Sequence, residues 1–384
     1  MTENDIKSYA KIIDCYNEDS CFIKNTIVIK YIPNISAALS GNRNYDITSV
    51  NLVESNDEGN KAKIEELVKR CNNAITREKN ISHWQVFYLY KELLQTLTGD
   101  ELKFNYFRGQ SDKNDLLPGA LRYSKNSDYI RDFEGLYLRL SYDFPDIINY
   151  VSMSESNIAE RETNLSVLQH YGLKTALLDI TKNPYIAMLF MLRENIDEYR
   201  SPTLYLFKIN DQEFDNPTLF SEVRKSHTNE RIIAQKGAFL NFEKVQKNEL
   251  LKAIPYVKII LEFDEFKYRD ALLFDDNATI IQKYNLIKNN KIGSHEDIDK
   301  IKESKDYYEK NINKVIELFD SIETTKKDCL EYINNELTQK LKEYYYLKED
   351  MFPDFENKIR YLSNKYVNDD IQDKDYKESK NKKG

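Results

Sequence analysis

The segment QHYGLKTALLDITKNPYIAMLF, residues 169–190, decides the fold of this chain. Its apolar run at 176–180 lacks polar alternation, which predicts a central strand covered on both faces. Asn183 can cap a helix and Pro184 suits a first helical turn, so the apolar block at 185–191 predicts a buried helix. The segment therefore predicts a strand followed directly by a helix, a position at which α/β proteins commonly bind ligands.

Asp179 and Thr181 fall at this junction, where polar side chains need partners. Burying an unpaired polar group costs about 1 to 3 kcal/mol, and a charge costs more. One interpretation is that the Asp179 carboxylate caps backbone N–H groups of the turn at 181–183. The other is that Asp179 contacts a ligand, and the sequence leaves both open.

The composition is that of a globular protein with many helices. The 384 residues are 41% hydrophobic, which is enough for a substantial core. Only 10 Gly and 8 Pro stand against 28 Tyr and 18 Phe, which favours long helices over a turn-rich sandwich. The net charge of −8 argues against broad binding of nucleic-acid phosphates, although it is compatible with a local basic groove.

The sequence predicts a cytoplasmic protein with no membrane partner. The N-terminus has no basic start followed by an apolar core, and no apolar run approaches the roughly 20 residues of a membrane span. The cysteines, at positions 15, 21, 71 and 329, have neither metal-ligand spacing nor a disulfide framework. We predict reduced thiols and no bound metal.

Patterning along the chain predicts an α+β fold, with a mixed central sheet of about five to seven strands packed with helices and a helical C-terminal extension. We expect strands at 21–35, 102–109, 176–180, 202–209, 231–242, 253–263 and 315–319. We expect helices at 61–71, from Ser82 onward, at 127–150, 158–171, 185–191, 324–345 and up to 367. The polar stretch 40–61 predicts a loop, and 116–122 predicts a loop with a short helical turn.

Arg108 is a candidate ligand-binding residue at the end of a predicted strand. It lies among aromatic residues and precedes Gly109, which lets a ligand or another backbone approach. A guanidinium in this place suits bidentate binding of phosphate or carboxylate. The alternative is an ion pair with Asp112, Asp115 or Asp179.

The segment RIIAQKGAFLNF, 231–242, is interpreted as a strand with a polar kink at Gln235, Lys236 and Gly237. A glycine inside a strand often marks a bulge or the close approach of a ligand. His170, near the end of a predicted helix, has a capping or packing interpretation beside a functional one. On the helix predicted from Ser127, the charged residues Arg131, Glu134 and Arg139 are predicted to form the solvated face.

Taken together, these segments resemble the FRG-domain family, named for the Phe-Arg-Gly triplet that stands here at 107–109. The resemblance extends over FRGQSD at 107–112, LLP at 116–118, Arg122, QHYGLKT at 169–175, LLDIT at 177–181, Asn183-Pro184 and RIIAQKGAF at 231–239, with a weaker echo, MFPDFENKIRYL, at 351–362. Two positions depart from the family pattern. Ala176 stands where the family usually has arginine, and Ile180 stands where it has tryptophan.

The resemblance implies a division of the chain around an FRG domain core at 82–265. A mixed α/β or helical region, 1–81, precedes this core. A charged, helical insertion is expected at 266–313, and the closing strand and helices of the FRG unit at 314–367. The tail at 368–384 is mixed in charge and is predicted to be disordered.

The resemblance also suggests an ADP-ribosyltransferase-like site, because the order of its parts is similar to that of enzymes that bind NAD and transfer ADP-ribose. Cleaving the nicotinamide bond develops positive charge on the ribose, while a cation holds the pyrophosphate. Asp179 and Gln235 are the candidate catalytic residues. Many such transferases carry a glutamate where Gln235 stands, and glutamine cannot take a proton. The candidate residues for binding NAD as substrate are Arg108, Gly109, Gln110, His170, Tyr171, Thr181 and Gly237.

Three functional hypotheses follow. The first is an NAD-dependent ADP-ribosyltransferase-like toxin or phage-defence effector, with an unknown protein or nucleic-acid acceptor and an operon-encoded partner. The second is a non-catalytic module that binds a nucleotide or RNA in the same cleft, with tyrosines available for stacking. The third, metal-dependent hydrolysis through Asp179 and His170, lacks a second acidic motif with ligand spacing.

Overall fold

The computed structural model describes residues 8–34, 45–77, 86–153, 157–193, 197, 199–210, 217–222, 233–247, 251–274, 310, 313, 317 and 320–351. The strands are β1 (Phe22–Pro33), β2 (Tyr45–Ser55), β3 (Tyr106–Gln110), β4 (Leu177–Thr181), β5 (Thr203–Phe207), β6 (Phe220–Ser221), β7 (Gly237–Asn241) and β8 (Ile254–Phe263). The helices are α1 (Ser8–Cys15), α2 (Glu18–Cys21), α4 (Lys61–Arg77), α5 (Val86–Thr98), α6 (Asp128–Asp143), α7 (Ile158–His170), α8 (Pro184–Met191), α10 (Glu265–Phe274) and α13 (Ile322–Glu343). Short 3-10 helices are η1 (Ala120–Arg122), η4 (Phe242–Lys247) and η5 (Lys348–Met351).

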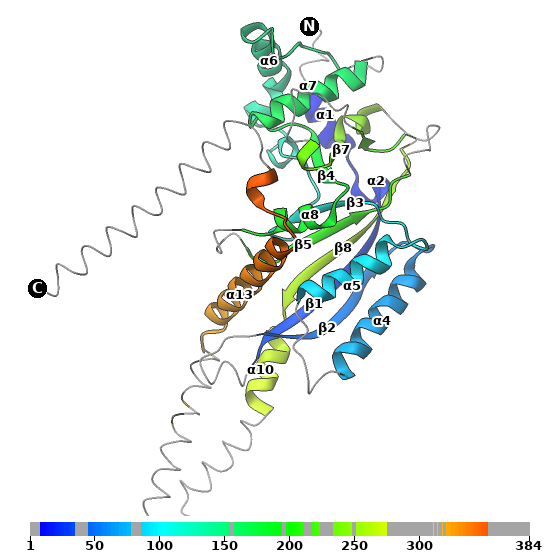
Figure 1. Cartoon of the computed structure of the whole chain (residues 1–384). Coiled ribbons are helices and arrows are strands. Elements are labelled where there is room, and N and C mark those ends of the chain that lie inside the picture. The colour runs from blue at the N-terminus through cyan, green and yellow to red at the C-terminus, as the bar shows by residue number, and fades with distance from the viewer. Residues whose placement is uncertain are drawn as a thin grey trace, which may run out of the picture.

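These elements form an α+β fold on one eight-stranded sheet of order β2-β1-β8-β5-β3-β4-β7-β6 (Figure 1). The sheet is mixed because β1 and β8 run parallel while the other neighbours are antiparallel. The predicted fold class is therefore confirmed, with one more strand than the upper end of the predicted range. The N-terminal region belongs to the same sheet, because β1 pairs with β8.

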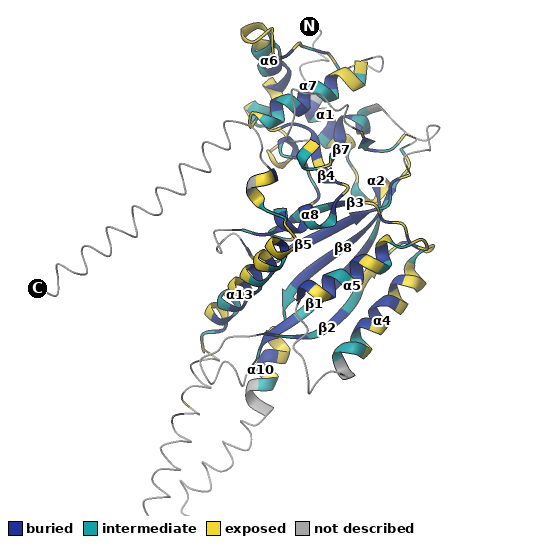
Figure 2. Ribbon diagram, viewed as in Figure 1, coloured by how far each residue is buried: buried dark blue, intermediate teal, exposed yellow. Residues whose placement is uncertain are grey.

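Both faces of the sheet are covered, as the central strand β5 shows. All five of its residues are buried: Leu204 and Leu206 belong to one apolar core, and Tyr205 and Phe207 belong to the other. Helices α4, α5, α8 and α13 contribute to the first core, and α1, α6 and α7 to the second. Figure 2 shows the buried strands between these helices. The strand alternates between two cores, which explains its continuous apolar sequence.

Strand β2 corrects the loop predicted for residues 40–61. Tyr45, Ile47 and Val50 point into the core and are buried, whereas the residues between them are more exposed. The strand pairs with β1 only, at the edge of the sheet. Its outward side chains are polar because that face is exposed to solvent. Their polar composition is the reason that the sequence predicted a loop here. Residues 40–44 lie outside the described residues.

The strand predicted at 231–242 begins only at Gly237. Ile233 and Ala234 are helical. Lys236 has a φ of 48°, which lies in the left-handed region, so a β-strand cannot continue through it. The polar kink is therefore a turn that precedes β7, and residues 231–232 lie outside the described residues.

The C-terminal predictions are tested in part. Helix α13 confirms the helix predicted at 324–345. Of the strand predicted at 315–319, only Glu317 is described, and it is helical. Most of the insertion at 266–313, the helix up to 367, the tail at 368–384, and Ser82 all lie outside the described residues.

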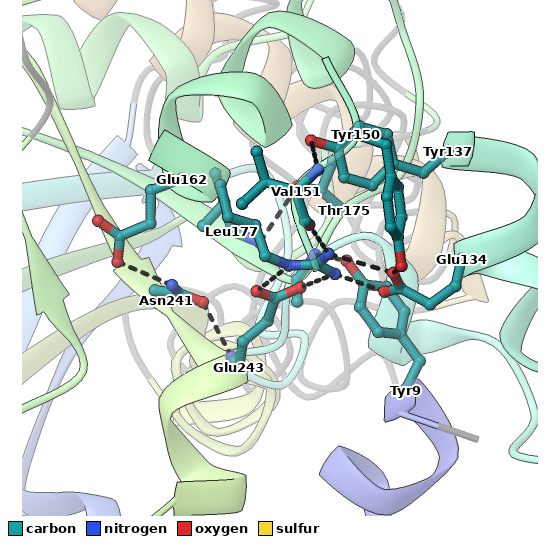
Figure 3. A network of polar contacts seen from close by, with 12 residues as sticks. Tyr9, Glu134, Tyr137, Tyr150, Val151, Glu162, Thr175, Leu177, Asn241 and Glu243 are labelled. Atoms are coloured by element: carbon teal, nitrogen blue, oxygen red, sulfur yellow. Dashed lines mark hydrogen bonds and ion pairs between the residues drawn. The ribbon is translucent and has the colours of Figure 1, made fainter. Parts of the chain in front are cut away.

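A buried ion cluster joins helices α6 and α7 to the end of β7 (Figure 3). Arg161 of α7 uses all five of its N–H donors: two on Glu243, two on Glu134, and one on the Val151 carbonyl at 2.6 Å. The three charged residues are at most 4% exposed. Glu134 was predicted to be solvated, which is wrong, because it is the partner of a cation that lies 27 residues further along the chain. Burial raises the pKa of Glu243, and Arg161 opposes that rise.

Candidate functional site

A split in the sheet between β3 and β4 creates the candidate site. Strand β3 pairs with β5 over five residues and β4 pairs with β7 over five, but β3 and β4 share only the pair Phe107 and Thr181. The two strands diverge beyond this pair. A cavity of about 210 Å³ lies here, lined by residues of β3, β4, β7 and α8 together with Gln235 and Arg193.

Arg108 of β3 reaches across this split. Its Nη1 donates to the backbone carbonyl of Asp179 at 2.7 Å. Asp179 is not paired with any residue of β3 in the sheet, so the side chain makes this contact in place of a backbone N–H. Its Nε is buried and has no hydrogen-bond partner among the described residues. Burial lowers the pKa of the Arg108 guanidinium, and the nearby Asp179 carboxylate opposes this shift. Arg108 thus brings a partly unpaired cation to the cavity.

None of the three ion pairs considered for Arg108 is present in the described part of the chain. Its contact with Asp179 goes to the main-chain oxygen, and neither Asp112 nor Asp115 lies within ion-pair distance. Its remaining donors are therefore not committed to a local carboxylate.

Asp179 presents an exposed carboxylate at the rim of the cavity. Gln169 Nε2 donates to both carboxylate oxygens at 2.8 Å, and the Thr175 hydroxyl donates to the Gln169 amide oxygen. The QHYGLKT segment therefore orients Asp179 from the end of α7. Asp179 is the one exposed residue of β4, and the other four are buried, so the strand is covered on both faces as expected except at this position.

The interpretation of Asp179 as a cap is wrong, because other residues cap the turn. Asn183 Oδ1 accepts from the backbone N–H groups of Tyr185 at 2.9 Å and Ile186 at 3.4 Å, and Pro184 opens α8 as predicted. Thr181 Oγ1 accepts from the Asn183 N–H at 3.0 Å and donates to the Gln235 carbonyl at 2.6 Å. Thr181 thereby connects the end of β4 to the turn before β7.

Gln235 and Gly237 also line the cavity, from the turn before β7 and from its first residue. Gly237 lies opposite Thr181 in the ladder. The side-chain amide of Gln235 donates to the Met351 carbonyl of η5 at 2.9 Å. The C-terminal segment therefore holds the amide of this candidate residue.

Gly109 lines the cavity but has a packing role as well. A Cβ atom at this position would lie 1.8 Å from the Ala187 carbonyl oxygen in α8. The sequence predicted that Gly109 allows a ligand or another backbone to come close, and the structure shows that this backbone is helix α8. Close contact of α8 with β3 forms one wall of the cavity.

The predicted residues Gln110, His170 and Tyr171 do not line this cavity. Gln110 is buried, and its amide has no hydrogen-bond partner among the described residues. His170 makes an edge contact with the ring of Tyr171, which is 65% exposed. The binding roles of all the predicted residues, inside and outside the cavity, stay predictions.

Three residues of the site were missed from the sequence. Gln169 orients Asp179. The sequence could have indicated this residue, because it stands next to His170 at the start of the same polar segment. Phe190 and Arg193 line the cavity at the end of α8. Asn334 of α13 accepts from the Arg193 N–H at 3.2 Å and donates to its carbonyl at 2.9 Å. No local sequence signal predicts this contact, because 141 residues separate the two partners.

Gly172 ends helix α7 and so fixes the position of Gln169. It has a φ of 98°, its N–H donates to the Gln169 carbonyl, and the N–H of Leu173 donates to the Leu168 carbonyl. This is the Schellman arrangement, in which glycine is favoured. Gly172→Ala should cost about 1 kcal/mol, purely from backbone conformation, since a Cβ there meets nothing within 4 Å.

Urea denaturation measures this cost. The variant Gly172→Asn should lose less than Gly172→Ala, because asparagine tolerates the left-handed region. Equal stability of the alanine variant and the wild type would contradict the assignment.

Two properties of the described residues bear on the other hypotheses. They contain no group of three or more His, Cys, Asp or Glu side chains arranged to hold a metal ion. Within the same residues, no helix has the length and hydrophobicity needed to cross a bilayer.

Comparison with known proteins identifies the central part of this structure. Residues 103–200 match the FRG domain. This range includes Arg108, Asp179 and helix α8, and it ends before Gln235. The chain therefore contains an FRG domain at residues 103–200. No curated protein and no solved structure gives a significant match to it.

The two departures from the family pattern lie in and beside the apolar core. Ala176 is fully buried, and its N–H donates to the hydroxyl of Tyr9 at 3.2 Å. Ile180 is 3% exposed and also borders the cavity. The smaller side chain at 180 therefore changes the cavity wall directly, whereas Ala176 contacts α1.

Proposed function

We propose that the cavity between β3 and β4 binds an NAD-type nucleotide, and that the protein breaks its bond to nicotinamide, which leaves, while the ADP-ribose is transferred to a nucleophile of a protein or nucleic-acid acceptor. One observation carries the proposal: Arg108 and Asp179, 71 residues apart in the chain, line one cavity. The first brings a buried, unpaired N–H group, and the second brings an exposed carboxylate.

The charges of the two residues match the two needs of the reaction. A guanidinium binds phosphate oxygens through charge-assisted hydrogen bonds. A carboxylate stabilises the positive charge that develops on the ribose when the nicotinamide leaves. Gln169 holds both oxygens of Asp179 at 2.8 Å, so the carboxylate is oriented before a ligand arrives.

The size of the cavity indicates which part of the nucleotide enters it. Pockets for drug-sized ligands measure about 300–1,000 Å³. A cavity of about 210 Å³ suits the nicotinamide and its ribose, while the rest of the nucleotide extends over the rim past Arg108.

A second candidate function is nucleotide binding without turnover. Gln235 favours it, because its amide cannot take a proton and is engaged by Met351. This function keeps the roles of Arg108 and Asp179 as binding residues.

The test measures nicotinamide release from NAD and calorimetric binding of ADP-ribose by the full chain. Arg108→Ala should weaken ADP-ribose binding about 10- to 100-fold, because hydrogen bonds to charged groups contribute about 1.5–3 kcal/mol. Arg131→Ala is the matched control, since Arg131 is exposed and pairs only with Asp128 of its own helix among the described residues. It should leave binding unchanged.

Asp179→Asn separates a ligand role from a structural one. The carboxylate is exposed and caps no backbone group, so the melting temperature should change little while ligand binding and nicotinamide release fall. Binding of ADP-ribose that requires Arg108, without nicotinamide release, would select the non-catalytic function. Binding that is the same in wild type and Arg108→Ala would reject both functions.

A further inference from the structure

A second and larger cavity has a volume of about 690 Å³. Its walls come from the start of β3, the end of β5, the β6 region and the start of β8. It shares no lining residue with the cavity at Arg108. Lys182 and Tyr106 lie between the two, with the Lys182 ammonium 5.2 Å from the Tyr106 ring.

The charge of this second cavity is opposite in sign to that of the protein. Four lysines, Lys103, Lys208, Lys244 and Lys252, line it together with a single carboxylate, that of Glu222. The chain as a whole carries a net charge of −8. The lysines are therefore concentrated here against the overall balance.

The lysine ammonium groups of this cavity differ in whether they already have an acidic partner. Lys244 has Glu162 at 3.8 Å and donates to the Phe220 carbonyl, and burial lowers its pKa. Lys103 and Lys208 have no acidic partner within ion-pair distance in the described part of the chain. The Glu222 carboxylate lies 3.5 Å from the ammonium group of Lys182, a residue that does not line the cavity.

The remaining walls are mixed: Ile209, Pro217, Phe220 and Pro255 supply apolar surface, and Asn105, Asn210 and Thr218 supply polar groups. Ammonium groups around one cavity repel each other, and low-dielectric walls strengthen this repulsion. A multivalent anion would relieve it, and the volume is in the range of small-molecule sites.

We propose that this lysine-lined cavity is a second binding site, for a small molecule that carries two or more phosphates. Lys103 and Lys208 contact the phosphates, and the apolar walls cover the remainder of the ligand. The site is independent of the function proposed for the first cavity, because it uses different residues.

The test uses the full chain with Arg108→Ala, so that the first cavity does not contribute. ADP and inorganic tripolyphosphate are titrated calorimetrically at low salt. We expect both to bind, and we expect Lys103→Glu/Lys208→Glu to weaken binding by at least about tenfold. Raising the ionic strength to about 0.5 M should weaken binding as well.

The matched control is Lys11→Glu/Lys267→Glu, which changes the net charge equally at two exposed positions away from the cavity. It should bind both probes as the parent does. Three results would overturn the proposal: no binding of either probe, equal binding in the Lys103→Glu/Lys208→Glu variant, or an equal loss in the control. Loss of nicotinamide release in Arg108→Ala with tripolyphosphate binding intact would show that the two sites are separate.

Discussion

Arg161→Met is expected to destabilise the protein by about 3 to 5 kcal/mol. The substitution leaves the carboxylates of Glu134 and Glu243 buried without a cation, which costs far more than an exposed pair would. It also removes the donor to the Val151 carbonyl. Chemical denaturation monitored by circular dichroism measures the loss.

The two glutamates provide the control, because the cluster holds two anions around one cation. Glu243→Gln removes the excess negative charge and keeps one of the two oxygens that accept from Arg161, so we expect a cost below that of Arg161→Met. If Glu243→Gln were as costly as Arg161→Met, the idea that the single cation stabilises both buried carboxylates would be wrong.

The pH dependence of the same cluster has a defined sign. Burial raises the pKa of Glu243, so the folded state binds a proton more readily than the unfolded chain does. The contribution of this group to stability is therefore greatest below the unfolded pKa of about 4.3, and it falls as pH rises through the raised folded value. The stability of the Arg161→Met variant should fall more steeply as the pH rises, because this variant lacks the cation that opposes the rise in the pKa of Glu243.

The second large effect is expected at Gly109. The variant Gly109→Ala places a Cβ atom 1.8 Å from the Ala187 carbonyl oxygen and 2.8 Å from the Met191 nitrogen. Both are backbone atoms of α8, so the helix must move away from β3. We expect a loss above the 1–3 kcal/mol of ordinary overpacking, together with loss of ligand binding in the cavity that α8 borders.

Gly59→Ala is the matched control, because its Cβ would meet only the Asp57 side chain at 3.6 Å, an ordinary contact. Melting temperatures of the two variants should differ clearly. A Gly109→Ala protein as stable as Gly59→Ala would show that α8 does not depend on this close contact.

Much of the fold could be predicted because its elements carry strong local signals. The buried run before Asn183 and Pro184 predicted both β4 and α8, and the cap contacts confirm the boundary between them. Strand β2 was missed because it is an edge strand, and its outward face has the composition of a loop. Its buried residues Tyr45, Ile47 and Val50 do not alternate strictly, because a bulge interrupts the pairing between Ile47 and Ser49.

The long-range polar contacts could not be predicted from local patterns. Glu134 looked like part of a solvated helix face, yet its partner Arg161 lies 27 residues further along the chain, and Arg161 also binds Glu243, 82 residues beyond it. The contact between Asn334 and Arg193 is similar. Sequence periodicity gives the face of a helix that is buried, but it does not identify a charged partner from another segment.

The candidate site was predicted better than its chemistry. Arg108, Asp179 and Gln235 line one cavity as expected, but Arg108 and Asp179 lie in the middle of β3 and β4 rather than at strand ends, and Gln235 lies in the turn before β7. The partner of Asp179 was not foreseen, because Gln169 and Asp179 meet through the left-handed turn at Gly172. A single residue with positive φ decides that contact.

The most direct test of the central claim is a crystal structure of the full chain with ADP-ribose. The account predicts ligand density in the split between β3 and β4, with a phosphate oxygen within hydrogen-bond distance of the Arg108 guanidinium and a ribose hydroxyl on the Asp179 carboxylate. An empty cavity, with ADP-ribose absent or bound only elsewhere on the protein, would contradict it.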